Sequence, residues 1–171
     1  MSVKFSIRPA LPADLPEIFA IYARARDFMK ETGNPNQWSD KWPPEDLVRE
    51  DVRLGRSFVC EAAGRVEGVF MLQSGLEPSY AVLEDGTWQS DAPYHTIHRI
   101  AASGRVHGVF SFCIRWCHAR CGYLRIDTHA DNKVMQHLIL KNGFRRAGIV
   151  HLDDGTDRIA YDLLPAEPDP T

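Results

Sequence analysis

Apolar and polar positions follow two periods along the chain, and together these periods predict an order of strands and helices. Alternating apolar residues indicate strands, whereas apolar residues three and four positions apart indicate helices. Combined with the glycine and proline positions, they predict the order β-α-α-β-β-β-α-β-α-β-β. The predicted strands cover residues 4–8, 57–62, 66–73, 94–102, 123–129, 144–152 and 157–164.

Four predicted helices separate these strands. Asp14 and Glu17 form a D-x-x-E pattern that predicts a capping box at the start of the first helix. Pro43-Pro44 precedes the second helix, the third covers about residues 108–121, and Asp131 is expected to cap the fourth. Each helix ends at or before a glycine, namely Gly33, Gly55, Gly122 and Gly143.

Two pairs of strands are joined by tight turns, at residues 63–65 and 153–156. Hairpins of this kind connect antiparallel strands and argue against a purely parallel, doubly wound sheet. The alternation of helices and hairpins therefore predicts a mixed α/β fold. We expect one domain over residues 1–164, followed by a flexible tail rich in proline and acidic residues at 165–171.

Composition narrows the class of protein. The chain has 171 residues, of which 44% are hydrophobic and 25% are charged, which are ordinary values for a globular domain and exclude disorder, collagen and coiled coil. No apolar run is long enough for a membrane helix, and the N-terminal residues do not resemble a signal peptide. Because the four cysteines are too few for a disulfide framework, we expect a cytoplasmic protein.

Three of the cysteines, Cys113, Cys117 and Cys121, recur every four residues and share one face of the predicted third helix. A metal site is one reading of this spacing. It matches neither the C-x-x-C pairs of zinc sites nor the common iron–sulfur patterns. Small apolar side chains on a core-facing helix are the favoured reading, so no metal is expected.

The stretch from Ile97 to Cys117 is the most informative in the chain. A predicted strand ends there, a loop with two glycines follows, and a helix begins. Backbone N–H groups and the positive end of the helix dipole then converge, which suits a phosphate. Gly108 would let a ligand approach the backbone, and Arg105 and His107 would supply side-chain donors. The alternative is a packing turn that binds nothing.

Three segments carry a resemblance to a known family: FSIRPALPADLPEIFAIY, HRIAASGRVHG and LRIDTHADNKVMQHLILKNGFRRAGIV, the last with the pattern N-x-x-M-x-x-L-x-x-K-x-G-F. Together they resemble the GNAT superfamily of acyl-CoA-dependent N-acetyltransferases, in its small stand-alone bacterial form. The resemblance spans most of residues 4–164. It implies a GNAT-like α/β fold with a mixed, mostly antiparallel central sheet of about seven strands flanked by about four helices.

The resemblance also implies acetyl-CoA as a co-substrate. In the family's loop pattern, Arg/Gln-x-x-Gly-x-Gly/Ala, Arg105 takes the first position and Gly108 the central glycine. Phe110 stands where a small residue is expected and could narrow the phosphate cradle. The pantetheine arm would pair with the end of strand 94–102. The implied cofactor-binding residues are Ile100, Ala101, Ala102, Arg105, Val106, His107, Gly108, Val109 and Asn132, although Asn132 could simply be a polar residue beside the Asp131 cap.

Acetyl transfer to an amine requires a route for the ammonium proton and an acid for the departing thiolate. Many members of the family use a tyrosine just after the signature leucine, but Ile139 stands there in this chain. The candidates for proton handling are therefore His98, Asp127 and His129, on the two strands expected to flank the thioester. Ordinary strand polarity is the alternative reading of each.

The linker NPNQWSDKW at residues 34–42 is the predicted acceptor wall. Gln37 can hydrogen-bond a polar substrate and Trp38 can stack on it, while Tyr80 of the loop 75–93 would form the opposite wall. Alternatively, the tryptophan only covers the edge of the core. The expected partner is a primary amine on a small molecule or peptide, and a homodimer stays open.

Two other function classes remain. The missing tyrosine and Phe110 leave open a non-catalytic acyl-CoA-binding or sensing module. A nucleic-acid binder would rest on the basic second half of the chain, but no recognition motif supports it. We therefore expect no nucleic acid and no membrane as partner.

The net charge of −3 hides an uneven distribution. Residues 98–149 hold nine basic and two acidic side chains, whereas acidic residues outnumber basic ones before and after this block. A basic block around the glycine loop would steer the phosphates of coenzyme A. The acidic first segment favours a cationic acceptor. The alternative is a solvated, arginine-rich surface.

Overall fold

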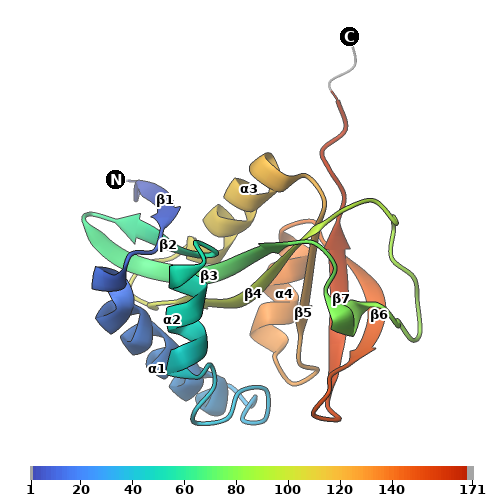
Figure 1. The fold of residues 1–171 in the computed structure, drawn as a ribbon, viewed down its shortest axis with the longest axis horizontal. Coiled ribbons are helices and arrows are strands. Elements are labelled where there is room, and N and C mark those ends of the chain that lie inside the picture. The colour runs from blue at the N-terminus through green and yellow to red at the C-terminus, as the bar shows by residue number, and fades with distance from the viewer. Residues whose placement is uncertain (1, 169–171) are drawn as a thin grey trace.

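Figure 1 shows a computed structural model of the protein, in which residues 2–168 are described. Within these residues, seven strands form one sheet, and four helices pack on it in the predicted order. The strands are β1 (Phe5–Pro9), β2 (Ser57–Ala62), β3 (Arg65–Ser74), β4 (His95–Ala102), β5 (Leu124–Thr128), β6 (Arg145–His151) and β7 (Asp157–Leu163). The helices are α1 (Leu15–Glu31), α2 (Glu45–Arg53), α3 (Val109–Cys121) and α4 (Lys133–Lys141).

The strands lie in the order β1-β2-β3-β4-β5-β7-β6. All described neighbours are antiparallel except β4 and β5, which are parallel. These two strands pair only where His95 lies opposite Leu124 and Thr96 opposite Arg125. Beyond Thr96 they diverge and the sheet opens in its middle. The predicted fold class, a mostly antiparallel sheet of seven strands with four helices, is confirmed.

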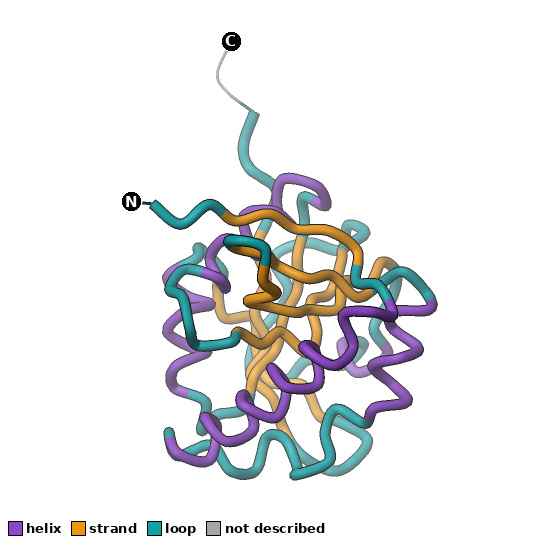
Figure 2. Tube along the Cα trace, turned by 90° about the vertical axis from the view of Figure 1, so that its left-hand side faces the viewer, coloured by secondary structure: helices purple, strands orange, loops and turns teal. Residues whose placement is uncertain are grey.

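Helices cover both faces of the sheet (Figures 1 and 2). Val59 and Val69 belong to a buried cluster with α1 and α2, whereas their chain neighbours Cys60 and Phe70 belong to a second cluster with α3 and α4. Successive side chains of a strand point to opposite faces. Strands β2 and β3 are therefore buried on both sides, which explains their nearly continuous apolar sequences.

The strand bounds differ from the prediction by no more than one residue. Asp14 occupies the N-cap position of α1, as predicted, but the predicted capping box is not formed. Its carboxylate makes no cap hydrogen bond to α1. It accepts hydrogen bonds from the Arg8 guanidinium at 2.7 and 2.9 Å and from the Leu11 N–H at 2.7 Å. A charged guanidinium is a stronger partner than a backbone N–H, so Asp14 turns toward β1 and a short 3₁₀ turn (Pro12–Asp14) precedes α1.

The predicted cap of the fourth helix is also wrong by one residue. Asn132, and not Asp131, occupies the cap position of α4, and its Oδ1 accepts a hydrogen bond from the Met135 N–H at 3.0 Å. Both residue types suit this position, so composition alone does not decide between neighbours.

The cysteines of α3 face the core, as predicted. Cys113 and Cys117 are buried against Cys60 and the sheet, and Cys121 is half-buried. Burial raises the pKa of the Cys117 thiol far above its usual value. Among residues 2–168, no group of three or more His, Cys, Asp or Glu side chains could hold a metal ion. The described part of the chain also contains no helix with the length and apolar character needed to cross a membrane.

Candidate active site

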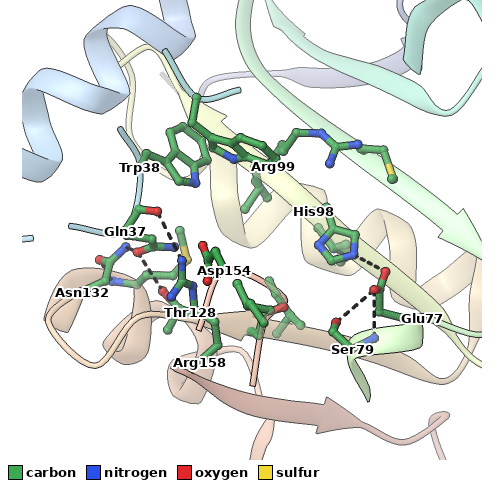
Figure 3. A pocket seen from close by; sticks show the side chains of 18 of the residues that line it. Gln37, Trp38, Glu77, Ser79, His98, Arg99, Thr128, Asn132, Asp154 and Arg158 are labelled. Carbon is green, nitrogen blue, oxygen red and sulfur yellow. Dashed lines mark hydrogen bonds and ion pairs between the residues drawn. The ribbon is translucent and has the colours of Figure 1, made fainter. Parts of the chain in front are cut away.

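The divergence of β4 and β5 leaves a cavity of about 720 Å³ (Figure 3). Residues 97–100 of β4 and 126–128 of β5 line it from the sheet. Its other walls come from the linker at 36–42, the turn at 77–79 and the β6–β7 turn at 152–154. Residues of α1, α2, β3, α4 and β7 complete the lining, so segments distant in sequence enclose one space, the arrangement expected of a ligand pocket.

Strand β4 carries a bulge beside this cavity. On β3 a single residue separates Val69 from Met71, whereas two residues separate their partners Ala101 and His98 on β4. One of the two, Arg99, has a φ of +51°, a left-handed conformation that costs a residue with a Cβ about 1–2 kcal/mol. Something must therefore hold Arg99 in place.

Two helices hold it. Asp51 of α2 is 2% exposed and accepts hydrogen bonds from the Arg99 guanidinium at 2.9 and 3.0 Å. The same carboxylate accepts one from Arg56 at 2.7 Å. The Tyr22 hydroxyl of α1 donates to the Arg99 carbonyl at 2.8 Å. Both α1 and α2 thereby fix the backbone that lines the cavity.

The glycine loop follows β4 at residues 103–108. Gly104 and Gly108 have φ of +78° and +90°, so both adopt the left-handed conformation that glycine tolerates best. Within residues 2–168, none of the backbone N–H groups of residues 106–111 donates to a protein acceptor. Several N–H donors at the start of α3 therefore remain for an anion.

The side chain of Arg105 does not join these donors. Its guanidinium donates to the buried Glu67 carboxylate at 3.1 Å and to the Val66 carbonyl at 2.8 Å. Ser103, also bound to Glu67, accepts a hydrogen bond from the Arg105 N–H at 3.1 Å. The expectation that the Arg105 side chain supplies a phosphate donor is thus replaced by a role in anchoring the loop to β3.

Phe110 does not narrow the loop. It is buried in the core cluster of α3 and α4, on the side away from solvent. Val109 is buried as well, and its Cγ1 would lie 2.5 Å from a Cβ at position 68. Gly68 therefore allows α3 to approach β3 closely. Burial of Val109 and Phe110 thus fixes the first turn of α3 in the core. The N–H groups of this turn make no hydrogen bond within the described residues.

The basic block of residues 98–149 is not one continuous patch. Arg99 and Arg105 form ion pairs with acidic residues from earlier in the chain, and Arg125 is buried between Trp88 and Tyr94, 3.9 Å from each ring. Near the loop, a second hollow of about 600 Å³ is lined by Lys4, His107, Gly108, Ser111 and Arg115. Basic side chains thus lie beside the loop, but Arg99, Arg105 and Arg125 of the basic block are engaged elsewhere.

His98 faces the cavity from β4. Its Nε2 lies 3.0 Å from Oε2 of Glu77, and Figure 3 shows the two side chains pointing toward each other. The hydrogen bond from His98 lowers the pKa of the Glu77 carboxyl to about 2, against its burial, which acts in the opposite direction. Glu77 therefore stays ionised and orients the imidazole.

Asp127 lines the cavity from β5, but Tyr80 does not line it. Tyr80 is 2% exposed and its hydroxyl donates to Asp127 Oδ2 at 2.6 Å. Burial raises the pKa of this phenol well above its usual value. The predicted substrate-binding role of Tyr80 is thus corrected: its hydroxyl holds the Asp127 carboxylate, and the side chain does not form a wall of the cavity.

Gln37 and Trp38 do line the cavity, together with Asn132. Oε1 of Gln37 accepts hydrogen bonds from the Asn132 amide at 2.9 Å, from the Asn34 amide at 2.8 Å and from the Thr128 hydroxyl at 3.4 Å. The linker is thus tied to β5 and α4. The linker was predicted to contact the acceptor and Asn132 the cofactor. The two meet at the hydrogen bond between Gln37 and Asn132.

His129 lies outside the cavity lining. Its Nδ1 accepts a hydrogen bond from the Asp131 N–H at 3.0 Å, and its side chain is largely buried. The structure thus groups His98 and Asp127 with the cavity and separates His129 from them. The ordinary structural reading of His129, as a residue that shapes the turn before α4, accounts for these contacts.

Sequence reasoning missed three residues of the site: Asp51, Glu77 and Arg158. Glu77 stands in a loop next to Pro78, Asp51 inside a polar helix, and Arg158 in a strand of the closing hairpin. Each of these is an ordinary place for a charged residue. What marks them is their position in the fold: Glu77 and Arg158 line the cavity, and the buried Asp51 holds Arg99, which lines it. The linear sequence does not contain this information.

Comparison of the sequence with family models finds no match, and comparison with curated proteins finds none. Comparison of the structure finds a GNAT-family acetyltransferase from Streptococcus agalactiae 2603, with 29% identity and a TM-score of 0.86 over 95% of this chain and 96% of that chain.

A GNAT-family acetyltransferase from Listeria monocytogenes 4b F2365 is 20% identical, with a TM-score of 0.68 over 96% of this chain and 98% of that one. The ribosomal-protein-S18-alanine N-acetyltransferase of Escherichia coli is 16% identical, with a TM-score of 0.56 over 97% of each chain. These two share the fold with this chain. The sheet order, the divergence of β4 from β5 and these full-length matches together show that the chain has the GNAT N-acetyltransferase fold.

Proposed function

We propose that this protein is an acetyltransferase that moves an acetyl group from acetyl-CoA to a primary amine, by direct attack in a ternary complex. The observation that carries the proposal is the joint presence of two features at β4. A cavity of about 720 Å³ opens between β4 and β5, and a loop of free N–H donors follows the same strand. A molecule with a diphosphate and a long amide-bearing arm fits this pair of features.

Acetyl-CoA would bind along β4 and the loop. Its diphosphate would accept hydrogen bonds from the N–H groups of residues 106–111, where the α3 dipole adds to the attraction. Its pantetheine amides would pair with the backbone of residues 100–102, since described β4–β5 pairing ends at Thr96. On the opposite side of the cleft, Asn132 and Gln37 offer amide groups.

His98 would handle the proton of the amine. Because the Glu77 carboxylate accepts a hydrogen bond from Nε2 of His98, it favours the tautomer with the proton on Nε2. The other ring nitrogen, Nδ1, is then the acceptor. The neutral amine attacks the thioester carbonyl, the C–N bond forms, and the C–S bond breaks. The amine proton passes to His98, and the thiolate takes a proton from solvent. Position 139 supplies no acid, because isoleucine has no ionisable group and Ile139 is fully buried in the core.

Proximity of the two substrates would contribute a large share of the rate. The experiment that tests the proposal has two steps. Isothermal titration measures whether acetyl-CoA binds, and a thiol assay with a panel of primary amines measures whether free coenzyme A is released. Binding together with amine-dependent thiol release is the expected result.

The two other outcomes separate the rival functions. If acetyl-CoA binds and no amine releases thiol, the non-catalytic acyl-CoA-binding module is the better description. If acetyl-CoA neither binds nor raises the melting temperature, both the enzyme and the sensor are excluded. A ligand that binds the native state raises the Tm, so an unchanged Tm in the presence of acetyl-CoA would indicate that it does not bind.

A further inference from the structure

Asp127 faces His98 across the opening of the sheet. The last described pair of β4 and β5 joins Thr96 to Arg125, and His98 and Asp127 each follow two positions later. Side chains two positions apart on a strand point to the same face. In a closed sheet the two residues would be neighbours on one face. Because the strands diverge, part of the cavity lies between them, and both residues line it.

One side chain from the loop before β4 lies against both residues. The hydroxyl of Tyr80 donates a hydrogen bond to Asp127 Oδ2 at 2.6 Å, and the centre of its ring lies 6.3 Å from that of the His98 ring. Tyr80 is buried, and burial raises the pKa of its phenol well above the usual value. The phenol therefore keeps its proton at neutral pH and acts as a donor. Its contacts place the carboxylate and the imidazole on the same face of the sheet.

The segment that carries Tyr80 also fixes His98. Oε2 of Glu77 lies 3.0 Å from Nε2 of His98. The Tyr80 N–H donates to the Glu77 carbonyl at 2.9 Å, which closes a 3₁₀ turn over Pro78–Tyr80. A single turn thus holds one polar side chain of each diverging strand.

Asp127 keeps one oxygen for a ligand. Within residues 2–168, its carboxylate accepts one hydrogen bond, from Tyr80 on Oδ2, and forms no ion pair. Arg125, two positions earlier on β5, donates instead to the Ser90 carbonyl at 2.9 Å. Polar atoms that are shielded from solvent take a hydrogen-bond partner. Because an ionised carboxylate only accepts, the partner of Oδ1 must be an N–H or O–H group.

A primary amine has the donors that this arrangement needs. It carries two N–H groups and one lone pair, so one N–H can reach Nδ1 of His98 and the other Oδ1 of Asp127. The lone pair then attacks the thioester carbonyl, the C–N bond forms and the C–S bond breaks. The proton of the first N–H passes to His98. The second N–H stays on the nitrogen and becomes the N–H of the product amide, so Asp127 gains no proton.

We propose that the acceptor amine is held between His98 and Asp127, with one N–H on each, and that Tyr80 positions the Asp127 carboxylate. This arrangement rests on the proposed function and narrows its substrate class to amines without an N-alkyl substituent. A secondary amine has a single N–H, which must pass to His98 and leaves Asp127 without a donor. Asp127 touches the acceptor, whereas Tyr80 acts through Asp127 and is a positioning residue.

The first test compares primary amines with their N-methyl derivatives on the wild-type protein. Propylamine, benzylamine, tyramine and L-leucinamide are assayed by thiol release with acetyl-CoA, each beside the derivative with one methyl group on the reacting nitrogen. The primary amines are expected to have a kcat/KM higher by about 10- to 100-fold, the range for a hydrogen bond to a charged group. Because N-methylation leaves an amine similarly basic, intrinsic reactivity does not produce this preference.

The variant D127N removes the charge and keeps the size of the side chain. It should lower kcat/KM for the primary amines by about 10- to 100-fold and bring the preference close to one. A preference caused by crowding of the methyl group would persist in D127N. D127E keeps a carboxylate and should retain part of the preference. The dissociation constant for acetyl-CoA should stay within about threefold of wild type in both variants.

The variant Y80F tests the positioning role. It should lower kcat/KM by about two- to tenfold, the range for an ordinary hydrogen bond. Added to D127N, it should cost less than about twofold, because Tyr80 acts through the carboxylate. Y123F is the matched control, since the Tyr123 hydroxyl also donates to a carboxylate at 2.6 Å, that of Asp162, and neither residue lines the cavity. Y123F should lose stability as Y80F does and keep the wild-type kcat/KM.

The outcomes distinguish this arrangement from the proposed function. If wild type acetylates the N-methyl amines as well as the primary amines, or if D127N turns over like wild type, the arrangement is wrong and the acetyltransferase stands. An equal effect of Y80F with and without D127N would show that Tyr80 does not act through Asp127. If acetyl-CoA does not bind, or binds and no amine releases thiol, the proposed function fails and the arrangement fails with it. The wild-type comparison holds even if D127N does not fold.

Discussion

Oε2 of Glu77 lies 3.0 Å from Nε2 of His98, although the two residues are 21 positions apart in the chain. Glu77 is itself held in place, since the Ser79 N–H and hydroxyl donate to its Oε1 at 3.3 and 2.9 Å. The Glu77 N–H donates to the Tyr94 hydroxyl at 2.9 Å. The imidazole on β4 is thus oriented by a carboxylate whose own position is set by a turn.

Replacing His98 by Gln should lower kcat more than it changes cofactor affinity. A general base contributes about 10²- to 10⁴-fold to a proton-transfer step, so we expect a loss of that order in kcat. The dissociation constant for acetyl-CoA, measured by titration, should stay within about threefold of wild type. H118Q is the control, because His118 lies at the far end of α3 and contacts the Leu164 carbonyl. Equal turnover of H98Q and wild type would remove His98 from the mechanism.

Replacing Glu77 by Gln should reduce stability in a way that depends on pH. The folded-state pKa of Glu77 is lowered to about 2 from an ordinary 4.5. A lowered carboxyl pKa stabilises the fold above the ordinary value, and this contribution is lost as the pH falls from 4.5 toward 2. Above pH 5 we expect wild type to exceed E77Q by about 1–3 kcal/mol in the free energy of unfolding.

Urea unfolding at several pH values measures this gap. It should shrink steadily below pH 4.5. E50Q is the control, because Glu50 is paired with Arg53 on the exposed surface, where ion pairs contribute little. A gap between wild type and E77Q that is the same at pH 7 and pH 3 would show that the carboxylate charge is not what stabilises this contact.

Replacing Gly108 by Ala should weaken acetyl-CoA binding. The position has a φ of +90°, while a Cβ there would meet only Phe5, at an ordinary 3.7 Å. The cost is therefore backbone strain of about 1–2 kcal/mol, which is relieved by turning the loop N–H groups away from the phosphate. We expect the dissociation constant to rise about tenfold or more.

Gly64 provides the matched control for Gly108. It has a φ of +75° in the β2–β3 turn, with nothing within 4 Å of a Cβ. G64A should lose stability to a similar extent, measured by thermal unfolding, and should bind acetyl-CoA like wild type. If G108A binds as tightly as G64A, the loop does not hold the phosphates.

Replacing Asp51 by Ala should destabilise the fold and also disturb the cavity. The change leaves Arg56 and Arg99 without their shared partner, and breaking a buried ion pair costs about 3–5 kcal/mol. Arg99 would lose the contact that holds its left-handed backbone. Acetyl-CoA binding should therefore weaken as well, because residues 100–102 follow directly.

Chemical denaturation and titration test this pair of effects. D40A is the comparison, since Asp40 pairs with Lys30 on the exposed surface. D40A should leave both stability and affinity near wild type. An Asp51 variant that loses stability while binding acetyl-CoA normally would show that the β4 bulge holds its shape without α2.

Much of the fold was predictable because its signals are local. Glycines at helix ends, the turn at residues 63–65 and the alternation in β4 each act within a few residues. The errors at Asp14 and Asp131 are of another kind. Asp14 shows this: its carboxylate binds the guanidinium of Arg8, which belongs to β1, instead of an N–H group of α1.

The site was predictable only in part. The glycine loop, His98, Gln37 and Asn132 stand out because they belong to a motif, or to a strand or linker that the resemblance places beside the ligands. Glu77 and Arg158 carry no such mark. Glu77 is placed by its contact with His98, and Arg158 by its contact with the Gln37 carbonyl. Both contacts join distant parts of the chain, and no spacing in the sequence encodes them.

The sequence by itself determined the order of the elements and the place of the glycine loop, because backbone conformation and helix ends follow from nearby residues. Only the tertiary structure decided how the charges are used. Packing turned Arg105 toward Glu67, placed His98 against Glu77 and buried Arg158 in the wall of the cavity. The reason is physical: a charge is neutralised by whichever opposite charge the fold brings near it, and that neighbour comes from a distant part of the chain.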